Sequence, residues 1–442
     1  MPQTRRESLR AGLGWSAVAV PDRAKEATTQ FLKAQFHRYY DGSKPALPDR
    51  FGRREFGFMF WTAGIVQRHL GFSREGELRS FLSSRVPAHA YYSSAYYETP
   101  NAPTMEEKGW LGADLIFDLD ADHLPNAAKM SYQEMLEAIR LKILHLYDNF
   151  LGADFGFEEK AMRIVFSGGR GYHIHVFDER VWPLGSHERR EIVDWITGKG
   201  LDVGAVFRES AFDKKEFQGH TRVKKRFVAP AQDEPGWRGK IMRGVNAFAA
   251  KLESMQAGEA IKFLSSFDQV SDRDAKDLYD NLFKPRGTKR VIRGVDRLRE
   301  GQLESLSDRS RDLLIRLVQD LQPVRFEELG GVSLEGIVQR AETDEPVTSD
   351  IKRLIRMPSS LHGKTGLQVI PMSRDAIDGF RPLRDAVPQV WTDESVRMNL
   401  KNKISMEIRG EAFNLAPGVN DVPQYLAIFL AARGLATVVP EA

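Results

Sequence analysis

No cysteine occurs among the 442 residues of the sequence. Without cysteine the chain has no disulfide, no thiolate nucleophile, no iron–sulfur cluster and no zinc site built on thiolates. A long hydrophobic run is also missing, because the most apolar stretch, residues 425–439, is interrupted by Arg433 and Gly434 and is too short to span a bilayer. The first 15 residues contain arginines but lack the apolar segment of a secretory signal. We therefore expect a cytoplasmic protein that makes no contact with a membrane.

The chain also lacks a large excess of charge of one sign. Its 64 Lys and Arg residues oppose 61 Asp and Glu residues, which leaves a net charge of +3. A charge this small indicates nucleic-acid binding only if the basic residues are clustered. With 42% hydrophobic residues the chain can bury a sizeable core. Its length predicts two or three structural units, at about 150 residues per domain.

The patterns of apolar and charged residues predict an α/β (α+β) protein in four segments. Residues 1–21 are expected to form a basic arm, and residues 22–187 the first part of an α/β unit. Residues 188–322 are expected to form a mostly helical, charged insertion. Residues 323–442 are expected to complete the α/β unit and to end in a helix near 422–432.

Individual elements can be predicted from periodicity and capping signals. Ser131 and Glu134 have the spacing of a capping box, which predicts a helix start. Residues 163–166 and 173–177 are expected to form an antiparallel pair, because a short glycine-rich turn connects them. The other expected elements are a helix over residues 22–42 and strands over residues 54–60 and 114–120.

The strand over residues 114–120 ends in two acidic residues, Asp118 and Asp120. Because they are two positions apart, both point to one side of the strand, with Cα atoms roughly 6.6 Å apart. Two carboxylates so placed can bind a divalent ion, the arrangement used for nucleotidyl transfer. A solvated strand face is the alternative, although like charges at the end of an apolar strand cost stability unless a cation compensates them.

The turn that follows, residues 167–173, combines Ser167, three glycines, Arg170 and His173. Backbone N–H groups of a glycine-rich turn can surround a phosphate, and an arginine binds its oxygens in a bidentate manner. A plain hairpin loop with a solvated arginine is the alternative. His173 and His175 share a strand face, but no third ligand lies nearby in sequence, so no zinc site is predicted.

A third candidate region, residues 352–366, is basic. It contains Arg353, Arg356, His362 and Lys364, which could compensate the charge of a triphosphate, although an ordinary basic surface loop is the alternative. Gly363-Lys364-Thr365 is similar to the end of a Walker A loop. Position 358 is proline where that motif needs glycine, so a P-loop ATPase is excluded.

The order of these motifs resembles the catalytic small subunit of archaeal DNA primases, in the archaeo-eukaryotic primase superfamily. The resemblance covers residues 25–185 and 325–370. It implies an open, RRM-like antiparallel or mixed sheet with a mostly helical insertion. It also implies a DNA-directed RNA polymerase of the primosome that synthesises short RNA, and also DNA, primers on single-stranded DNA for replication.

The resemblance also assigns roles to residues. Asp118, Asp120 and Asp344 match a catalytic triad that binds Mg²⁺ or Mn²⁺. Arg54 is similar to a further arginine that contacts the substrate. The positions that match nucleotide-binding residues are Ser167, Arg170, His173, Arg356 and His362.

Further expectations concern partners. The resemblance implies a heterodimer with a large regulatory subunit that carries an iron–sulfur cluster, contacts to other replication proteins, binding of NTPs or dNTPs, and a location at the nucleoid. Basic residues of the insertion are expected to contact template phosphates. Relatives often carry a zinc knuckle after the acidic strand, but residues 126–140 contain neither Cys nor His, so no zinc is predicted.

Two alternatives remain open from the sequence. The first is an end-joining repair polymerase of the same superfamily, which would need a pre-existing primer. The second is a catalytically inactive, primase-like scaffold that only binds nucleic acid.

Overall fold

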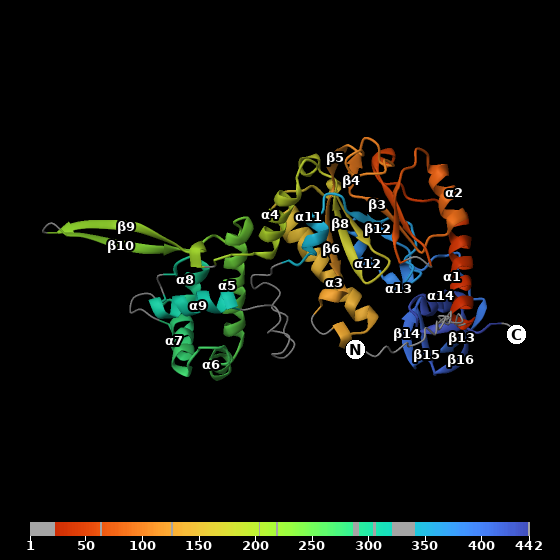
Figure 1. Ribbon diagram of the computed structural model, residues 1–442. Helices are drawn as coiled ribbons and strands as arrows, with labels where there is room; N and C mark the ends of the chain where they lie inside the picture. Colours follow the sequence, from red (N-terminus) through yellow and green to blue (C-terminus); the bar gives the residue numbers. More distant parts are fainter. Residues whose placement is uncertain are drawn as a thin grey trace, which may run out of the picture.

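The computed structural model describes eight ranges of the chain: 23–61, 64–124, 127–202, 204–217, 220–285, 291–303, 306–320 and 341–440. Within these ranges the side chains of residues 123, 128, 208–228 and 319–320 are not described. The predicted arm over residues 1–21 and the predicted boundary at 322/323 lie outside the described residues. Figure 1 shows a larger lobe, built from the two ends of the chain, and a smaller helical lobe that carries a long hairpin.

The first sheet of the larger lobe has the strand order β11-β3-β1-β2, with antiparallel neighbours. Aromatic side chains hold helix α2 against it, and the rings of Phe58 and Phe81 lie 4.6 Å apart. The strand predicted over 54–60 is confirmed as β1. The elements of this layer are α1 (Arg23–Gly42), β1 (Phe56–Met59), β2 (Val66–Leu70), α2 (Glu75–Arg85), β3 (His89–Ser93) and β11 (Leu354–Arg356).

The second sheet has the order β12-β7-β8-β6, again with antiparallel neighbours. The predicted pairing of β7 with β8 is confirmed. The capping box is confirmed too, because the Ser131 side chain accepts a hydrogen bond from the Glu134 N–H and helix α3 begins at the next residue. The elements are β6 (Leu115–Asp120), α3 (Tyr132–Leu146), β7 (Met162–Phe166), β8 (Gly171–Val176) and β12 (Ile370–Met372).

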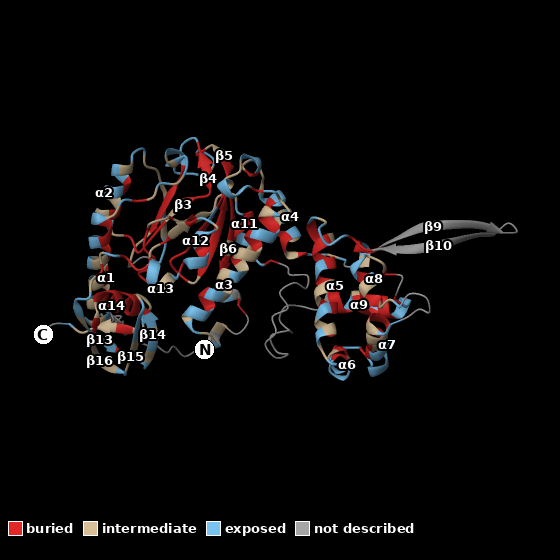
Figure 2. Cartoon of the chain, turned by 180° about the vertical axis from the view of Figure 1, so that it is seen from behind, coloured by how far each residue is buried: buried red, intermediate tan, exposed pale blue. Residues whose placement is uncertain are grey.

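The α/β class with antiparallel sheets is thus confirmed, and the strands that border the site belong to two four-stranded sheets. Helix α3 buries Leu136, Ile139 and Ile143 in the core behind the second sheet. Figure 2 shows buried residues along the strands of the larger lobe. A further pair of short strands, β4 (Ala95–Tyr97) and β5 (Trp110–Ala113), precedes β6.

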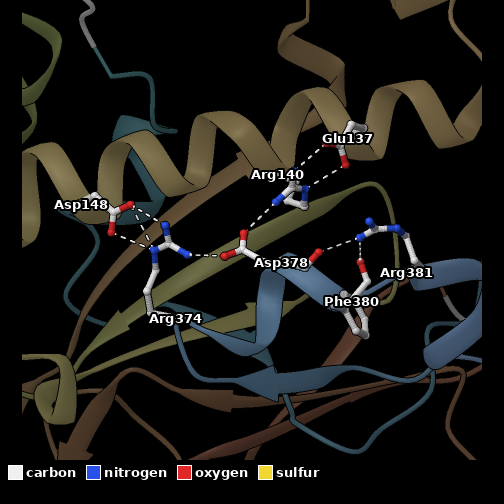
Figure 3. A network of polar contacts seen from close by, with 7 residues as sticks. All are labelled: Glu137, Arg140, Asp148, Arg374, Asp378, Phe380 and Arg381. Carbon is white, nitrogen blue, oxygen red and sulfur yellow. Dashed lines mark hydrogen bonds and ion pairs between the residues drawn. The ribbon is translucent and has the colours of Figure 1, made fainter. Parts of the chain in front are cut away.

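A network of ion pairs fastens helix α3 and the segment after it to the chain that follows β12 (Figure 3). Arg374 contacts both oxygens of Asp148, and Asp378 receives hydrogen bonds from Arg374 and Arg140. The network therefore joins residues more than 200 positions apart in the chain. The elements involved are η4, a π-helix (Tyr147–Gly152), and the short helices α12 (Ala376–Gly379) and α13 (Pro382–Asp385).

The smaller lobe contains helices where the sequence predicts them, together with one element that it does not. Residues 208–217 and 220–228 form two antiparallel strands, a hairpin that projects from the lobe (Figure 1). The basic residues Arg222, Lys224, Lys225 and Arg226 lie on its second strand. Helix α4 (Ser186–Thr197) belongs to the larger lobe, where its Arg189 donates to the carbonyl oxygens of Ala113 and Asp114. The elements of the smaller lobe are β9 (Arg208–Phe217), β10 (His220–Val228), α5 (Gly236–Ser254), α6 (Ala257–Ser265), α7 (Asp272–Phe283), α8 (Gly294–Arg299) and α9 (Asp308–Asp320).

The C-terminal part of the chain packs beside α1. The helix predicted near 422–432 is confirmed as α14, but it does not close the chain, because β17 follows it and pairs with β13. The Thr28 hydroxyl of α1 accepts a hydrogen bond from the Val438 N–H of β17. The elements are β13 (Ser395–Leu400), β14 (Ile404–Ile408), β15 (Glu411–Leu415), β16 (Gly418–Pro423), α14 (Gln424–Ala432) and β17 (Ala436–Val438).

Two remaining observations complete the fold. Among the helices that the structure describes, none combines the length and the apolar character needed to cross a bilayer. The short helical elements not named above are η1 (Phe51–Arg53), η2 (Ala121–His123), η3 (Ala127–Lys129), η5 (Glu159–Ala161), η6 (Glu179–Val181), η7 (Gly204–Val206) and α11 (Glu345–Ser349).

Candidate active site

A cavity of about 580 Å³ lies between the two sheets of the larger lobe. Strands β6 and β8 contribute to its lining from one sheet, and β3 and β11 from the other. The glycine-rich turn before β8, the loop over residues 362–365 and the end of α14 complete the lining. Three regions that the sequence singled out separately are therefore brought together around one space.

Asp118 and Asp120 point into this cavity from β6. As predicted from their spacing, they lie on the more open side of the strand, whereas Leu115, Phe117 and Leu119 are buried. The Asp118 side chain is 22% exposed, and the Asp120 side chain is 37% exposed. The two carboxylates thus face a space that a ligand can enter.

Asp344 lies next to Asp118 but lines a neighbouring small cavity instead of the main one. Its backbone N–H donates to the Asp118 carbonyl oxygen at 3.0 Å, which holds the segment before α11 against β6. No side-chain capping bond engages Asp344 at the start of that helix. The structure therefore brings the third predicted aspartate beside the first, and its part in a metal site stays a prediction.

The negative charges around Asp118 affect its own protonation. Burial together with the neighbouring carboxylates of Asp120 and Asp344 raises the pKa of Asp118 to about 7. Among the described residues, no Lys or Arg forms an ion pair with Asp118; its ionisable neighbour is His173, whose Nε2 atom lies 3.3 Å away. A bound cation would relieve this repulsion, so the electrostatics favour a cation at this carboxylate.

His173 stands directly opposite Asp118 in the pairing of β8 with β6. Burial and the cations of Arg356 and Arg353 lower the pKa of His173 to about 3, so the imidazole is neutral at physiological pH. Among the residues that the structure describes, none forms a hydrogen bond with its buried Nδ1 atom. The ring therefore adds no positive charge to the site and stands ready as a neutral polar group.

The glycines of the turn over residues 167–171 are required by close contacts. Gly168 has a φ of +74°, and a Cβ there would come within 2.8 Å of the His362 Cβ. A Cβ at Gly171 would lie 2.3 Å from the Leu119 carbonyl oxygen. The Thr365 hydroxyl donates to the Gly168 carbonyl oxygen at 2.5 Å. The turn and the loop that contains His362 are therefore packed against each other, with Ser167 and Gly169 on the cavity wall.

Cationic groups face the carboxylates across the cavity. Arg170 contacts Asp122 at 2.5 Å and lies 3.6 Å from Asp120. Arg356 comes from β11, and burial lowers its pKa below the ordinary arginine value. Burial and nearby cations also hold the pKa of His362 well below its usual range. The other cationic residues on the cavity wall are Arg353, Lys364 and Arg433.

Arg54 does not line this cavity, and its predicted contact with the substrate stays a prediction. Its side chain is fully buried and forms a 2.6 Å ion pair with the equally buried Asp114. Its remaining N–H groups donate to backbone carbonyls and to the Tyr96 hydroxyl. These internal acceptors engage each guanidinium nitrogen, so Arg54 supports the core beside β6.

Several cavity residues were missed from the sequence. Tyr91 lies on β3, and Asp122 follows the acidic strand beyond its last predicted residue. Arg433 follows helix α14, and its guanidinium stacks on the ring of Tyr132 at 4.8 Å. The Tyr132 hydroxyl in turn donates to the Gly169 carbonyl oxygen. No sequence signal links Arg433 to this distant glycine turn, so only the folded chain reveals it.

The side chains around the cavity suit an open metal site better than a closed one. In the ranges that the structure covers, no three His, Cys, Asp or Glu side chains are arranged to hold a metal ion. A closed, all-protein metal cage is therefore not formed. Two open carboxylates fit an ion such as Mg²⁺, which takes one or two protein carboxylates and keeps water and substrate phosphates in its shell.

Carboxylates suited to a divalent ion, set opposite cationic groups suited to a polyphosphate, define the class of this protein as an enzyme that acts on phosphate-bearing substrates. A family model described as DNA primase small subunit matches residues 117–374, and this range includes every cavity residue predicted from the sequence.

Curated relatives agree over nearly the whole chain. DNA primase small subunit PriS of Methanococcoides burtonii is 40% identical over 418 residues, which cover 93% of this chain and 99% of the relative. PriS of Methanocella arvoryzae is 39% identical over 94% of this chain and 100% of the relative. PriS of Halobacterium salinarum is 37% identical over the same shares. The chain therefore belongs to the DNA primase small subunit family.

Membership of this family confirms the activity predicted from the motifs. The chain is a DNA primase, a nucleotidyltransferase that acts in DNA replication. The family also implies the use of a divalent metal ion. The two alternatives from the sequence, a repair polymerase and an inactive scaffold, find no support in these matches.

Proposed function

We propose that the cavity between the two sheets is where this primase binds an incoming nucleoside triphosphate and joins it to a primer on single-stranded DNA. The observation that carries the proposal is the opposition of charge across one space. Asp118 and Asp120 line the cavity together with Arg356 and Lys364. The products would be short RNA primers, with DNA primers as a second product.

Asp118 and Asp120, with Asp344 on the adjacent segment, would hold Mg²⁺ or Mn²⁺. The bound metal would favour deprotonation of the primer 3′-hydroxyl and stabilise the pyrophosphate that leaves. The raised pKa of Asp118 supports this assignment, because burial and the nearby carboxylates of Asp120 and Asp344 raise it more than Arg353 and Arg356 lower it.

The cationic residues would bind the triphosphate, whose charge is about −4, and hold it in line for attack. Arg170, Arg356 and Lys364 would neutralise its oxygens, while the backbone N–H groups of the glycine turn would add hydrogen bonds. His173 and His362, both neutral, would contribute polar contacts without adding charge. The rigid packing of the two loops against each other would keep these groups in position before the substrate arrives.

Partners are proposed from the family and the sequence. The chain would form a heterodimer with a large regulatory subunit, and any iron–sulfur cluster of the complex would belong to that partner, because this chain has no cysteine. Other replication proteins would bring the complex to the nucleoid in the cytoplasm. The basic strand β10 would contact template phosphates.

The test of the metal and triphosphate assignment is the variant Asp118→Ala/Asp120→Ala. We expect nucleotide incorporation on an unprimed single strand to fall by more than about a thousandfold, with template binding within about twofold of the wild type. The matched control, Asp393→Ala/Glu394→Ala, removes two adjacent exposed carboxylates far along the chain and should leave synthesis unchanged.

Retained synthesis by the Asp118/Asp120 variant would overturn the assignment of these carboxylates. The unprimed template also tests the reaction itself. Synthesis that requires an added primer would favour the repair polymerase over a primase.

A further inference from the structure

His89, the first residue of strand β3, lies outside the cavity lining but contacts Arg356, which lines the cavity. It is not part of any motif recognised in the sequence. Its side chain is 5% exposed. It stands next to Ala88, at the point where β3 meets the loop over residues 362–366. The residue is therefore placed to influence that loop and the neighbouring strand β11.

Two donors converge on one nitrogen of the His89 ring. The Arg356 guanidinium donates to Nδ1 at 2.7 Å, and the Gly363 N–H donates to the same atom at 3.2 Å. A guanidinium has no acceptor, so the imidazole must be the acceptor and must carry its proton on Nε2. Burial and the cations of Arg356 and Lys364 lower the pKa of His89 to about 3, which keeps this acceptor available at neutral pH.

The loop is fitted closely against the histidine. A Cβ at Gly363 would lie 2.8 Å from the Ala88 carbonyl oxygen and 3.0 Å from Nε2 of His89. The rings of His89 and His362 meet edge to face, with centroids 4.9 Å apart. His89 thus touches the first two residues of the loop through its ring as well as through its hydrogen bond.

The choice of acceptor matters for the charge of Arg356. Within the described part of the chain, no carboxylate lies within ion-pair distance of this guanidinium, whose other close neighbour is the ring of Tyr91, with the centroid 5.3 Å from Cζ. A carboxylate partner would orient the guanidinium and at the same time cancel its charge. A neutral imidazole orients it and leaves the full positive charge for an anionic ligand.

We propose that His89 is a positioning residue for nucleotide binding, a hydrogen-bond acceptor that holds Arg356 and the 362–366 loop toward the triphosphate without neutralising them. The inference rests on the proposed role of Arg356 in binding the triphosphate. It predicts that the loss of the acceptor affects nucleotide affinity, whereas the template site, to which His89 does not belong, is unaffected.

The test compares His89→Leu, which removes the acceptor, with His89→Asn, whose side-chain oxygen can take the place of Nδ1. With the full chain, a single-stranded DNA template and ATP as the varied nucleotide, we expect H89L to raise KM about tenfold or more, with kcat within about threefold. H89N should keep KM within about threefold of the wild type. Affinity for the template should be the same in all three proteins.

A double-mutant cycle with Arg356→Ala separates this inference from the proposed function. If His89 acts through Arg356, H89L should raise KM less than about twofold further in the R356A background. An R356A variant with the wild-type KM would overturn the role of Arg356 and with it the inference. If R356A raises KM, the role of Arg356 stands. The inference alone is then overturned if H89L has the wild-type KM, or if H89L raises KM as much in the R356A background as in the wild type.

A third variant covers the case in which H89L does not fold. His89→Gln carries its amide at the position of Nε2, where it cannot accept the hydrogen bond from Arg356 in the same way. H89N should then have a KM about tenfold lower than H89Q. Equal KM values for the two amides would overturn the inference.

Discussion

Arg54 is a charged residue of a recognised pattern that forms a buried ion pair. Its guanidinium and the Asp114 carboxylate are both 0% exposed, and the Tyr96 hydroxyl donates to the same carboxylate at 2.5 Å. Asp114 directly precedes β6, the strand that carries Asp118, and Arg54 lies in the segment before β1. The pair therefore joins these two segments at the start of β6. A buried pair of this kind is costly to break, because the remaining charge is left without compensation.

We therefore predict that Arg54→Leu lowers the free energy of unfolding by about 3–5 kcal/mol. Urea denaturation of the full chain measures this value. The neighbouring Arg53 is exposed, and Arg53→Leu should change stability by less than about 0.5 kcal/mol. A raised KM for nucleotide in R54L with unchanged stability would instead favour the substrate contact suggested by the resemblance.

Gly171 offers a second prediction at the scale of single residues. It pairs with Asp120 across the β6–β8 ladder, and an added Cβ would lie 2.3 Å from the Leu119 carbonyl oxygen. Gly171→Ala must shift the strand that carries both candidate metal ligands, so we expect a loss of about 1–3 kcal/mol in stability together with reduced nucleotide incorporation. Gly258, in α6, has open space around it. Gly258→Ala is the control and should be neutral or slightly stabilising; wild-type activity in G171A would contradict the prediction.

The site residues differ in how far the sequence reveals them. Asp118 and Asp120 could be predicted because a period of two on an apolar strand determines which side they face. The burial of Arg54 beside Asp114 could not be predicted, because a sequence pattern does not show whether a charge is buried beside an opposite one. His89 and Arg433 could not be predicted, because contacts with residues hundreds of positions away bring Arg433 to the cavity and His89 to Arg356 behind it.

At the scale of elements, the junction between the lobes depends on a buried ion pair. Lys240 of helix α5 contacts Asp154, which follows the π-helix η4, at 2.5 Å, and the two side chains are 7% and 3% exposed. The Trp237 indole donates to the Trp195 carbonyl oxygen at 2.9 Å, and its ring meets Phe150 at 5.6 Å. The first turn of α5 is therefore fixed to the larger lobe by one ionic contact and an aromatic contact.

We predict that Asp154→Ala destabilises the protein by about 3–5 kcal/mol, because Lys240 remains buried and unpaired. Faster hydrogen exchange should be concentrated in the first turns of α5. The double variant Asp154→Ala/Lys240→Met removes both charges and should recover most of the stability. A double variant as unstable as D154A would show that the ion pair is not the cause.

Helices and strands were predicted correctly where a single sequence signal determined them. The capping box set the start of α3, and the short glycine turn set the antiparallel pairing of β7 with β8. Strands β9 and β10 were not predicted, because this part of the sequence was interpreted only by its cluster of basic residues. Thr221 and Val223 alternate with the charged residues Arg222 and Lys224, a period of two that is typical of a strand. Strand β17 was missed because three residues are too short to show any period.

At the scale of the whole molecule, the small net charge conceals a separation of charge. Carboxylates gather at the end of β6, while the basic residues of β10 lie on a hairpin that projects away from the larger lobe (Figure 1). A projecting, basic β-ribbon can track a phosphate backbone without reading its sequence. The proposed template contact and the proposed chemistry are thus assigned to different lobes.

We predict that replacing Arg222, Lys224, Lys225 and Arg226 by Gln weakens single-stranded DNA binding. The slope of the logarithm of affinity against the logarithm of salt concentration should fall by up to about 0.7 for each phosphate that the hairpin no longer neutralises. Fluorescence anisotropy over a range of salt concentrations measures both quantities. KM for nucleotide at saturating template should not change.

The matched control for the hairpin variant is a quadruple Gln variant of exposed lysines on other elements, Lys262, Lys276, Lys401 and Lys403. An equal reduction of affinity in the control would show that total charge, and not the hairpin, governs template binding.

The division of the larger lobe around its insertion has a consequence for synthesis on the ribosome. Strands β11 and β12 occupy the outer positions of the two sheets, beside β3 and β7, yet they follow β8 by nearly 180 residues. At 5–20 residues per second, translation of that interval takes on the order of 10 to 40 seconds. Throughout this period the hydrogen-bonding edges of β3 and β7 are without their final neighbours, the condition in which nascent chains associate wrongly. The same topology that brings distant loops to one cavity therefore makes the growing polypeptide dependent on protection of two open sheet edges.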